Sequence, residues 1–418
     1  MFIKEIYKLY SNTYLVDTDT RSIRKGSVFF ALKGENFNGN EFAKEAIEKG
    51  ASYAIIDEQE YLVGERTILV EDVLQTLQEL ATFHRNNLAI PVIALTGSNG
   101  KTTTKELISS VLNEKYHITS TKGNLNNHIG VPLTLLSMTP KTEVAVIEMG
   151  ANHHKEIEVL SKIANPDYGL ITNFGKAHLE GFGSVEGVIE AKSELYDFLR
   201  ERKKIAVVNP KDPIQMNKTI GIERILFDES IKLVGTSPYV FLTFNDLGIR
   251  SNLIGEYNFT NICAAITCGM EFDIDITTIK EAIEKYIPVN NRSQIVKKGN
   301  LTIVLDAYNA NPSSMKCSIE SFREMEGSYK TVILGDMFEL GNSSEKEHQE
   351  VISLLEESDF DQCYLVGEEF FKTNSRFEKF KTFNSFKECI KNGQIPNKGN
   401  LLIKGSRGMS LERILDII

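Results

Sequence analysis

A short glycine-rich segment carries the residue types of a phosphate-binding loop: Thr96-Gly97-Ser98-Asn99-Gly100-Lys101-Thr102-Thr103. It follows an apolar run at 90–95 and precedes a helical pattern at 107–112, which is the order of elements that such a loop requires. Its glycines allow backbone N–H groups to face phosphates, Lys101 can reach the outer phosphates, and Thr102 offers a hydroxyl to Mg²⁺. Only two residues separate the glycines, whereas the general form has four, so a plain tight turn is the alternative interpretation.

Two further polar residues follow apolar runs that would form strands. Glu148 ends the run that begins at Val144, and His178 follows the run at 168–172. Because the carboxyl ends of parallel strands share one edge of a sheet, we expect both residues beside the phosphate loop as Mg²⁺ ligands. The alternatives are a solvated strand end for Glu148 and an ordinary loop histidine for His178.

Lys192 falls on the apolar face of a helical pattern that spans 185–199. A lysine that points inward is costly unless it is paired or modified. Snorkelling, or pairing with a carboxylate such as Glu180, is the simpler interpretation. The other interpretation is a neutral lysine that accepts CO₂ and becomes a carbamate, an anionic oxygen ligand for Mg²⁺.

Three successive α/β domains are expected to position these residues, and 418 residues suffice for about three. The first covers residues 1–88, with strands expected at 27–32 and 53–56 and helices expected at 41–49 and 74–86. The second covers 89–295 and ends in a helical stretch at 258–287. Its all-apolar strands, typical of a parallel sheet covered on both faces, are expected at 90–95, 144–147, 168–172 and 204–208. The third, Rossmann-like domain covers 296–418, with strands expected at 301–305, 331–334, 364–366 and 401–403.

Composition disfavours several classes of function. The net charge of −10 disfavours binding to a nucleic-acid backbone. No apolar run approaches the roughly 20 residues of a membrane helix, and the charged N-terminus does not fit a signal peptide. Five cysteines without a C-x-x-C spacing fit a reducing compartment rather than a disulfide framework or a thiolate zinc site. We therefore expect a cytoplasmic protein that binds neither nucleic acid nor a membrane. A monomer is expected as well, although composition does not determine the oligomeric state.

Taken together, these segments resemble the Mur ligase family, the ATP-dependent amide-forming enzymes of peptidoglycan precursor synthesis. The resemblance extends over essentially the whole chain. Thr18-Asp19-Thr20-Arg21, with the run at 26–34, is similar to the family's uridine-nucleotide segment, and 124–132 is similar to a substrate-side loop. Residues 148–151 and 177–183 match the metal region, and two further matching segments lie at 334–341 and 404–409.

The resemblance implies a role for individual residues. The UDP substrate would contact Thr18, Asp19, Thr20, Arg21, Asn126 and Asn127. Adenine and phosphates would contact Asn258, Asn261 and Arg292, and the ribose would contact Asp306. Ala191-Lys192 matches the lysine that is carbamylated in related ligases. Two Mg²⁺ ions would then be held by Thr102, Glu148, His178 and carbamylated Lys192, with Lys101, His178 and Lys192 as the catalytic residues.

Within the family, Asp306-Ala307-Tyr308-Asn309-Ala310-Asn311-Pro312 is most typical of the member that adds D-alanyl-D-alanine to a UDP-MurNAc-tripeptide through an acyl phosphate. Asn309, Asn311 and Arg407 are polar candidates for contacts with the dipeptide, and structural hydrogen bonds are the alternative for each. Other functions that the sequence leaves open are another Mur or folylpolyglutamate-type ligase, a P-loop nucleotide-dependent switch, and an inactive scaffold.

Overall fold

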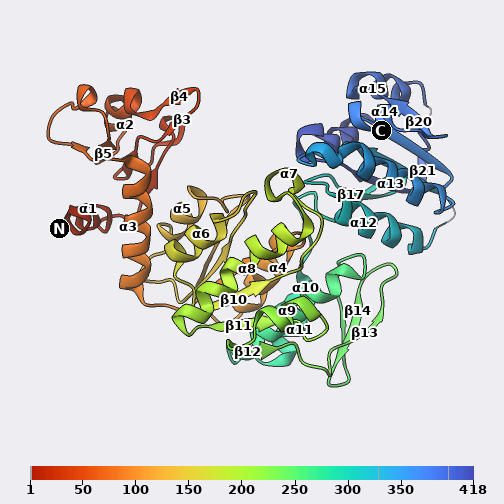
Figure 1. The fold of residues 1–418 in the computed structure, drawn as a ribbon, viewed down its shortest axis with the longest axis horizontal. Coiled ribbons are helices and arrows are strands. Elements are labelled where there is room, and N and C mark those ends of the chain that lie inside the picture. The colour runs from red at the N-terminus through yellow and green to blue at the C-terminus, as the bar shows by residue number, and fades with distance from the viewer. Residues whose placement is uncertain (1, 328, 394) are drawn as a thin grey trace.

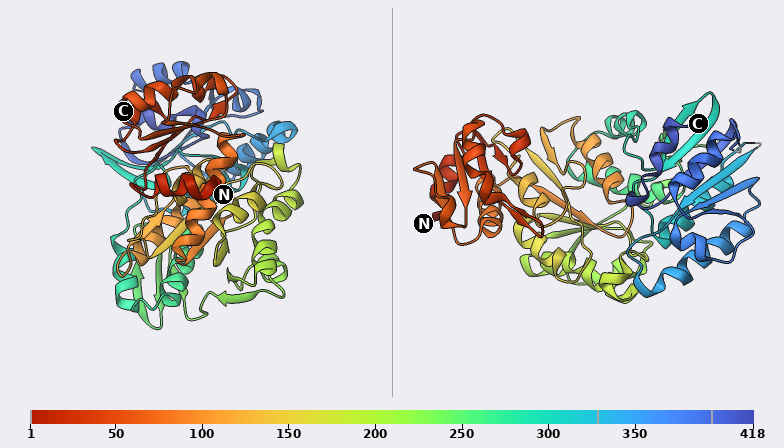
Figure 2. Two further views of the ribbon diagram at one scale, coloured as in Figure 1. Left: turned by 90° about the vertical axis from the view of Figure 1, so that its left-hand side faces the viewer. Right: turned by 90° about the horizontal axis from the view of Figure 1, so that it is seen from above.

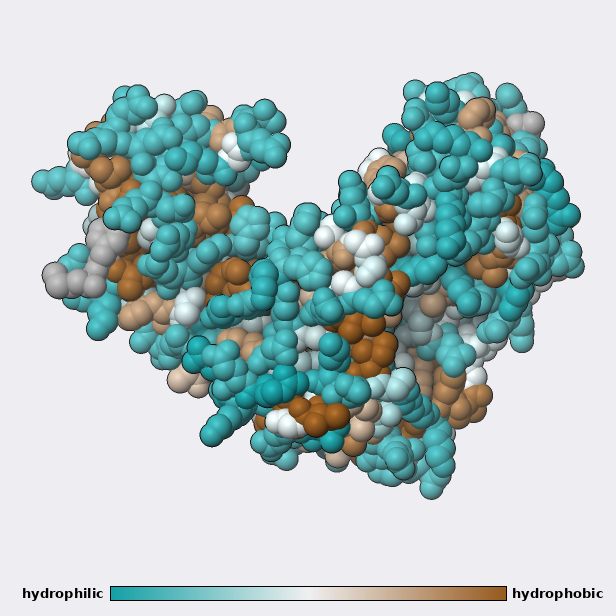
Figure 3. Space-filling view, viewed as in Figure 1, coloured by the Kyte–Doolittle hydropathy of each residue, from teal (hydrophilic) through white to brown (hydrophobic). Residues whose placement is uncertain are grey.

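The computed structural model describes residues 2–327, 329–393 and 395–418. Three α/β bodies follow one another along a crescent, with the N-terminal body at one tip and the C-terminal body at the other (Figure 1). The view from above shows the same elongated row (Figure 2), and the space-filling view shows a hollow between the tips (Figure 3). No described helix has the length and apolar character needed to cross a membrane. The expected three-domain α/β class is confirmed.

The N-terminal body contains a four-stranded parallel sheet in the order β1-β2-β5-β6, with bounds β1 Val16–Asp17, β2 Val28–Phe30, β5 Tyr53–Ile56 and β6 Thr67–Leu69. Its other elements are α1 Phe2–Tyr10, α2 Ala43–Glu48, α3 Val73–Leu88, and the small ribbon of β3 Lys33–Gly34 and β4 Phe37–Asn38. The helix expected at 41–49 starts later because Gly39–Phe42 form a 3₁₀ turn.

Helix α3 joins this body firmly to the central one. Its inner residues Leu77 and Leu80 share one continuous apolar core with Tyr10 of α1 and Leu135 of the central body. The buried Arg85 guanidinium donates to a carboxylate oxygen of Asp167 at 2.6 Å, across the same boundary. A buried charge that is paired in this way fixes the angle between helix and sheet, because breaking the pair would leave an uncompensated charge.

The central body contains a six-stranded, fully parallel sheet in the order β12-β11-β10-β7-β9-β8. The strands are β7 Val92–Thr96, β8 Ile118–Ser120, β9 Val144–Glu148, β10 Tyr168–Ile171, β11 Ile205–Val208 and β12 Glu223–Leu226. The helices are α4 Lys101–Leu112, α5 Gly130–Leu135, α6 Glu156–Ala164, α7 Leu179–Phe182, α8 Val185–Arg202 and α9 Pro213–Lys218. All residues of β7 and β9 are buried, which explains why both strands are apolar up to their last residues, Thr96 and Glu148.

Two features of the central body differ from the expectation. The helical stretch expected at 258–287 is two helices, α10 Tyr257–Glu271 and α11 Ile276–Lys285, separated by a turn in which Asp273 has φ +53°. An antiparallel three-stranded sheet of β13 Lys232–Gly235, β14 Phe241–Phe244 and β15 Leu247–Arg250 was not predicted. Its strands have only four residues each, so their alternating pattern is too brief to detect from the sequence.

The C-terminal body contains six strands in the order β16-β17-β21-β18-β19-β20, of which only β16 is antiparallel. The strands are β16 Gln294–Lys298, β17 Asn300–Asp306, β18 Lys330–Gly335, β19 Gln362–Val366, β20 Glu378–Phe380 and β21 Lys398–Lys404. The helices are α12 Pro312–Glu324, α13 Ser344–Glu356, α14 Glu368–Lys372 and α15 Phe383–Lys391. The last strand is inserted between β17 and β18, so loops that follow these three strands meet at one edge.

Replacing Tyr10 by Phe should lower the free energy of unfolding by about 1–3 kcal/mol. The fully buried Tyr10 hydroxyl donates to the Leu136 carbonyl at 2.8 Å, and its loss leaves that carbonyl without a donor. Chemical denaturation followed by circular dichroism measures the change. Tyr53→Phe is the matched control, because its half-buried hydroxyl has no hydrogen-bond partner among the described residues. Equal shifts in the two variants would contradict the prediction.

Candidate active site

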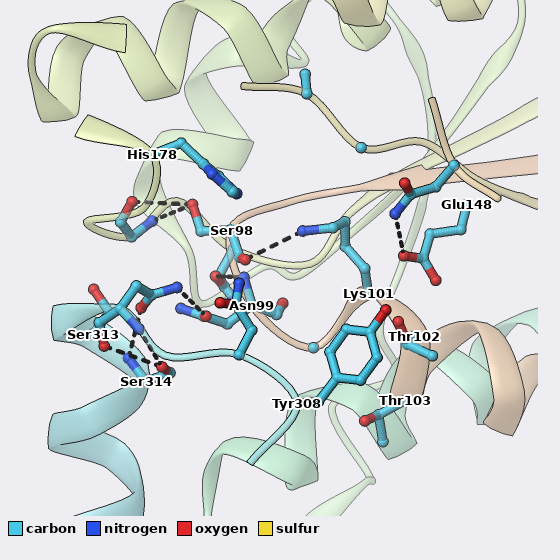
Figure 4. A pocket seen from close by; sticks show the side chains of 18 of the residues that line it. Ser98, Asn99, Lys101, Thr102, Thr103, Glu148, His178, Tyr308, Ser313 and Ser314 are labelled. Atoms are coloured by element: carbon cyan, nitrogen blue, oxygen red, sulfur yellow. Dashed lines mark hydrogen bonds between the residues drawn. The ribbon is translucent and has the colours of Figure 1, made fainter. Parts of the chain in front are cut away.

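The loop between β7 and α4 lies directly on the neighbouring strand β10. A Cβ on Gly97, where φ is +141°, would lie 2.0 Å from Thr172 Oγ1, so only glycine allows this approach. The Thr172 hydroxyl donates to the Asn99 carbonyl at 2.6 Å, and the Ser98 N–H donates to the Asn173 carbonyl at 3.0 Å. The loop is therefore fixed by the sheet and opens toward a cavity of about 1150 Å³ (Figure 4).

Lys101 begins α4 and lies at the floor of this cavity. Its ammonium group donates to the carbonyls of Gly97 at 2.6 Å and Ser98 at 3.2 Å. Burial lowers the pKa of Lys101 to about 8, nearby Glu148 opposes the shift, and Arg292 adds to it. A phosphate that replaced the two neutral carbonyls would restore the charged form.

Glu148 ends β9 on the other side of β7 and is almost completely buried. Its backbone N–H donates to Thr121 Oγ1 at 2.9 Å, and the Asn126 amide donates to Oε1 at 2.8 Å. The second carboxylate oxygen, Oε2, is buried and has no hydrogen-bond partner among the described residues. Thr102 also lines this cavity, so a carboxylate oxygen and a hydroxyl are available to a divalent cation.

The protein alone does not form a complete metal cage. Within residues 2–327, 329–393 and 395–418, no cluster of three or more His, Cys, Asp and Glu side chains could hold an ion. The orphaned oxygen of Glu148 and the hydroxyl of Thr102 fit Mg²⁺, which usually keeps few protein ligands and completes its coordination with phosphate oxygens and water. The residues present therefore suit a Mg²⁺ ion that arrives with a nucleotide.

His178 and Lys192 are held by other partners in this structure. The His178 side chain points into the cavity (Figure 4), and its Nδ1 contacts the carboxylate of Glu339 from the C-terminal body. Lys192 is fully buried in α8, donates to the Ala151 carbonyl at 2.9 Å and lies 5.0 Å from the centre of the Phe182 ring. Burial lowers the pKa of Lys192 well below its ordinary value. Lys192 lies behind Ala151, which itself lines the cavity.

The C-terminal body supplies the opposite wall of the cavity. Asp306, Asn309, Asn311 and Arg407 of this body line the cavity as predicted. Asn258 and Asn261 of α10 and Arg292, which precedes β16, line it as well. The Asn311 amide donates to Asn99 Oδ1 at 2.8 Å and so joins the two walls. Arg292 lies over the Tyr308 ring, 3.8 Å from its centre. Tyr308 and Glu339, which also line the cavity, had received no role from the sequence, although both lie in segments that match the family.

Asp306 is already saturated with internal donors. Its carboxylate accepts from Lys404 Nζ at 2.5 Å, the Ser318 hydroxyl at 2.7 Å and the Ser293 N–H at 3.2 Å. Burial by itself would raise the pKa of Asp306, but the Lys404 charge and these donors hold it below its usual value. The carboxylate therefore joins β17, α12 and β21 at the cavity wall.

The residues expected to contact a UDP substrate are divided between two places. Asn126 and Asn127 line the cavity, where Asn126 holds Glu148 and Asn127 Oδ1 accepts the Gly130 N–H at 2.9 Å. The 18–21 segment lies in the N-terminal body and does not line the cavity. There Asp19 accepts hydrogen bonds from Arg21, which lower its pKa to about 2.

Comparison with known proteins identifies the family. Residues 12–90, 95–269 and 291–407 match, in order, the family models described as "Mur ligase family, catalytic domain", "Mur ligase middle domain" and "Mur ligase, glutamate ligase domain". The UDP-N-acetylmuramoyl-tripeptide–D-alanyl-D-alanine ligase of Bacillus subtilis (strain 168) is 35% identical over 430 residues, which cover 96% of this chain and 92% of that protein. The chain belongs to the Mur ligase family. The resemblance identified from the sequence is confirmed.

Another relative of the same name and two solved MurF structures also match this Mur ligase over nearly its whole length. The UDP-N-acetylmuramoyl-tripeptide–D-alanyl-D-alanine ligase of Escherichia coli (strain K12) is 32% identical over 423 residues, with 96% of this chain and 92% of that protein covered. A crystal structure of MurF from Acinetobacter baumannii matches with a TM-score of 0.86 and 30% identity, covering 96% of this chain and 92% of that one. A MurF ligase from Thermotoga maritima in complex with ADP matches with a TM-score of 0.86, 29% identity and 96% coverage of both chains.

The lowered pKa of Lys101 predicts that nucleotide binding depends on pH. Free Lys101 loses its proton above about pH 8, whereas bound phosphate favours the ammonium, so binding at pH 8.5 should take up a proton. Above pH 8 the affinity for ADP should fall by up to about tenfold per pH unit. Calorimetry in buffers of different ionisation enthalpy measures the uptake. Lys101→Arg, which stays charged, is the control, and the same uptake in that variant would contradict the assignment.

Proposed function

We propose that this Mur ligase joins D-alanyl-D-alanine to the terminal carboxylate of a UDP-MurNAc-tripeptide, with cleavage of ATP to ADP and phosphate. The observation that carries the proposal is the cavity, where a phosphate loop, Lys101 and the unpartnered oxygen of Glu148 meet between two domains. Two relatives at 32% and 35% identity, both named UDP-N-acetylmuramoyl-tripeptide–D-alanyl-D-alanine ligase, span nearly the whole chain and suggest the substrates. The reaction belongs to peptidoglycan precursor synthesis, which we assign to the cytoplasm.

The chemistry explains why ATP is needed. An ionised carboxylate is a poor acyl donor because oxide would have to leave. One carboxylate oxygen attacks the γ-phosphorus, the bond to ADP breaks, and an acyl phosphate forms. The amine of D-alanyl-D-alanine, after losing a proton, attacks the acyl carbon; the C–N bond forms, and the C–O bond to phosphate breaks. Lys101 offsets the charge of the two anions that meet in the first step.

We assign one Mg²⁺ ion to Thr102 and Glu148, and a second ion to His178 and a carbamylated Lys192. When bound, such ions would neutralise the phosphate oxygens of ATP and favour transfer of the phosphoryl group. The unpartnered Oε2 of Glu148 supports the first assignment. For the second, the loop that contains Ala151 has to leave room for a carbamate to approach the cavity, because Lys192 lies behind it.

Carbamylation of Lys192 is consistent with its surroundings. The full burial of the amine and its strongly lowered pKa favour the neutral form, and only a neutral amine attacks CO₂. The new N–C bond forms as one proton leaves, and the product carries a negative charge. A carbamate at this position would replace a buried neutral amine by an anion that can bind a metal ion.

The two substrates that are joined would approach the cavity from opposite sides. We assign the UDP portion to Thr18, Asp19, Thr20 and Arg21, together with Asn126 and Asn127 near the reacting carboxylate. The dipeptide is assigned to Asn309, Asn311 and Arg407 on the C-terminal wall, and the nucleotide to the phosphate loop with Asn258, Asn261, Arg292 and the neighbourhood of Asp306. Because acyl phosphates hydrolyse, the C-terminal domain has to close over this site and exclude water.

The decisive experiment measures phosphate release from ATP with Mg²⁺ and UDP-MurNAc-tripeptide, with and without D-alanyl-D-alanine. Release should require the dipeptide, and mass spectrometry should show a product heavier by one dipeptide less water. Release that ignores the dipeptide would favour a nucleotide switch, and release with another amino acceptor would favour a related Mur or folylpolyglutamate-type ligase.

Lys101→Ala should lower kcat by about 10²-fold or more, because one charge partner of the transferred phosphoryl group is lost.

Lys192 variants test the carbamate. Lys192→Ala should lose activity that added short carboxylates partly restore, because a diffusible carboxylate can replace the missing anion. Lys192→Arg keeps a positive charge and cannot form a carbamate, so it should remain inactive with or without the additive. Full activity of Lys192→Arg would contradict the carbamate, and mass spectrometry of the intact protein under CO₂ gives an independent measurement.

A further inference from the structure

A loop of the C-terminal body reaches across the cavity and contacts His178. This loop, residues 336–341, follows β18 and is called the β18 loop below. The carboxylate of Glu339 contacts His178 Nδ1, and the Glu180 N–H donates to the Glu339 carbonyl at 3.2 Å. Gly341 also packs against Glu180, since a Cβ there would lie 3.4 Å from the Glu180 Cβ. Both the side chain and the backbone of the β18 loop therefore meet the segment that carries His178.

Hydrogen bonds to other parts of the C-terminal body fix the β18 loop in place. Asp336 is buried, and its two carboxylate oxygens accept the N–H groups of Glu369 at 3.0 Å and Phe370 at 2.9 Å. The Met337 N–H donates to His348 Nε2 at 3.0 Å, and the Phe338 N–H donates to Ser406 Oγ at 2.9 Å. These bonds fix three successive residues before Glu339.

Both partners of the contact have an uncommon backbone conformation. Glu339 has φ +62° and His178 has φ +51°, a region that residues other than glycine rarely adopt. Such conformations persist where the surrounding structure enforces them, and they are concentrated at functional sites. The two backbones are therefore shaped to present these side chains to each other.

The contact determines which nitrogen of His178 is available. An ionised carboxylate only accepts hydrogen bonds, so Nδ1 must carry the proton in this pair. A neutral imidazole with its proton on Nδ1 has its lone pair on Nε2. Metal-binding histidines are commonly oriented in this way by a carboxylate on the other ring nitrogen.

We infer that Glu339 is a positioning residue, supplied by the C-terminal domain, that orients the His178 ring so that Nε2 faces the cavity as a ligand. The inference rests on the proposed function for the assignment of His178 as a Mg²⁺ ligand. It gives a role to the family-matching segment at 334–341, which neither the phosphate loop nor the Glu148 site explains. It also makes the His178 ligand complete only when the two domains are in contact.

The competing interpretation is that the contact between Glu339 and His178 is a latch, meaning that it only holds the two domains together. The structure offers a matched control for this interpretation. Lys176 Nζ contacts the buried carboxylate of Glu347 at 2.8 Å, an ion pair between the same two bodies. Neither Lys176 nor Glu347 lines the cavity. Glu347→Gln therefore weakens the interdomain contact and leaves His178 with its carboxylate.

The first measurement is the tautomer of His178 in the protein without metal. Long-range ¹⁵N–¹H NMR of histidine-labelled protein, assigned with His178→Asn, should show the proton on Nδ1 in the unaltered chain and in Glu347→Gln. Glu339→Ala should shift it toward Nε2, the form that free imidazole side chains favour. An unchanged tautomer in Glu339→Ala would overturn the inference. This readout does not depend on any substrate, so it stands even if the proposed reaction fails.

The second measurement uses Mn²⁺ as the probe, followed by electron paramagnetic resonance in the presence of ADP. Glu339→Ala should weaken Mn²⁺ binding about 10–100-fold, and Glu339→Gln, whose amide oxygen still accepts from Nδ1, should recover part of the loss. In turnover, Glu339→Ala should lower kcat and raise the metal requirement with little change in KM for ATP. Equal metal binding in Glu339→Ala and the unaltered chain would overturn the inference. The same loss in Glu347→Gln would also overturn it, because the effect would then come from contact between the domains.

Discussion

The close approach of Gly97 to Thr172 is the contact on which the rest of the site depends. It allows the phosphate loop to lie flat on the edge of β10, where Thr172 and Asn173 hold the Asn99 carbonyl at 2.6 and 3.0 Å. With the loop fixed there, α4 begins at Lys101 and the carboxyl end of β9 lies on its other side. A parallel sheet in which β7 lies between β9 and β10 thus brings an ammonium and a carboxylate to one cavity.

The burial of Glu148 shows how the fold keeps a charge available. One oxygen is satisfied by Asn126, and the Thr121 hydroxyl fixes the backbone, but the other oxygen has no partner among the described residues. An unsatisfied buried carboxylate oxygen costs free energy that a structural role does not need. Its retention is therefore best explained by a ligand that supplies the missing positive charge.

The sequence predicted what depends on local pattern and failed where contacts are long-range. Uniformly apolar runs identified β7, β9 and β10 because buried parallel strands need apolar residues on both faces. The pairs His178–Glu339 and Asp306–Lys404, 161 and 98 residues apart, join elements that no periodicity connects. The bond from the Asn126 amide to Glu148 could not be predicted either, because a polar side chain's partner depends on the neighbouring loop rather than on its own segment.

The internal partners of the cavity residues differ in how readily a ligand can replace them. Lys101 contacts two neutral carbonyls, and exchanging these for phosphate oxygens strengthens a charge-assisted contact. Asp306 contacts the ammonium of a buried lysine, and removing either partner would leave an uncompensated charge in a site of low dielectric. The Lys101 contacts are thus suited to exchange on nucleotide binding, whereas the Asp306–Lys404 pair is suited to persist and to hold the cavity wall in which Tyr308 and Arg292 stack.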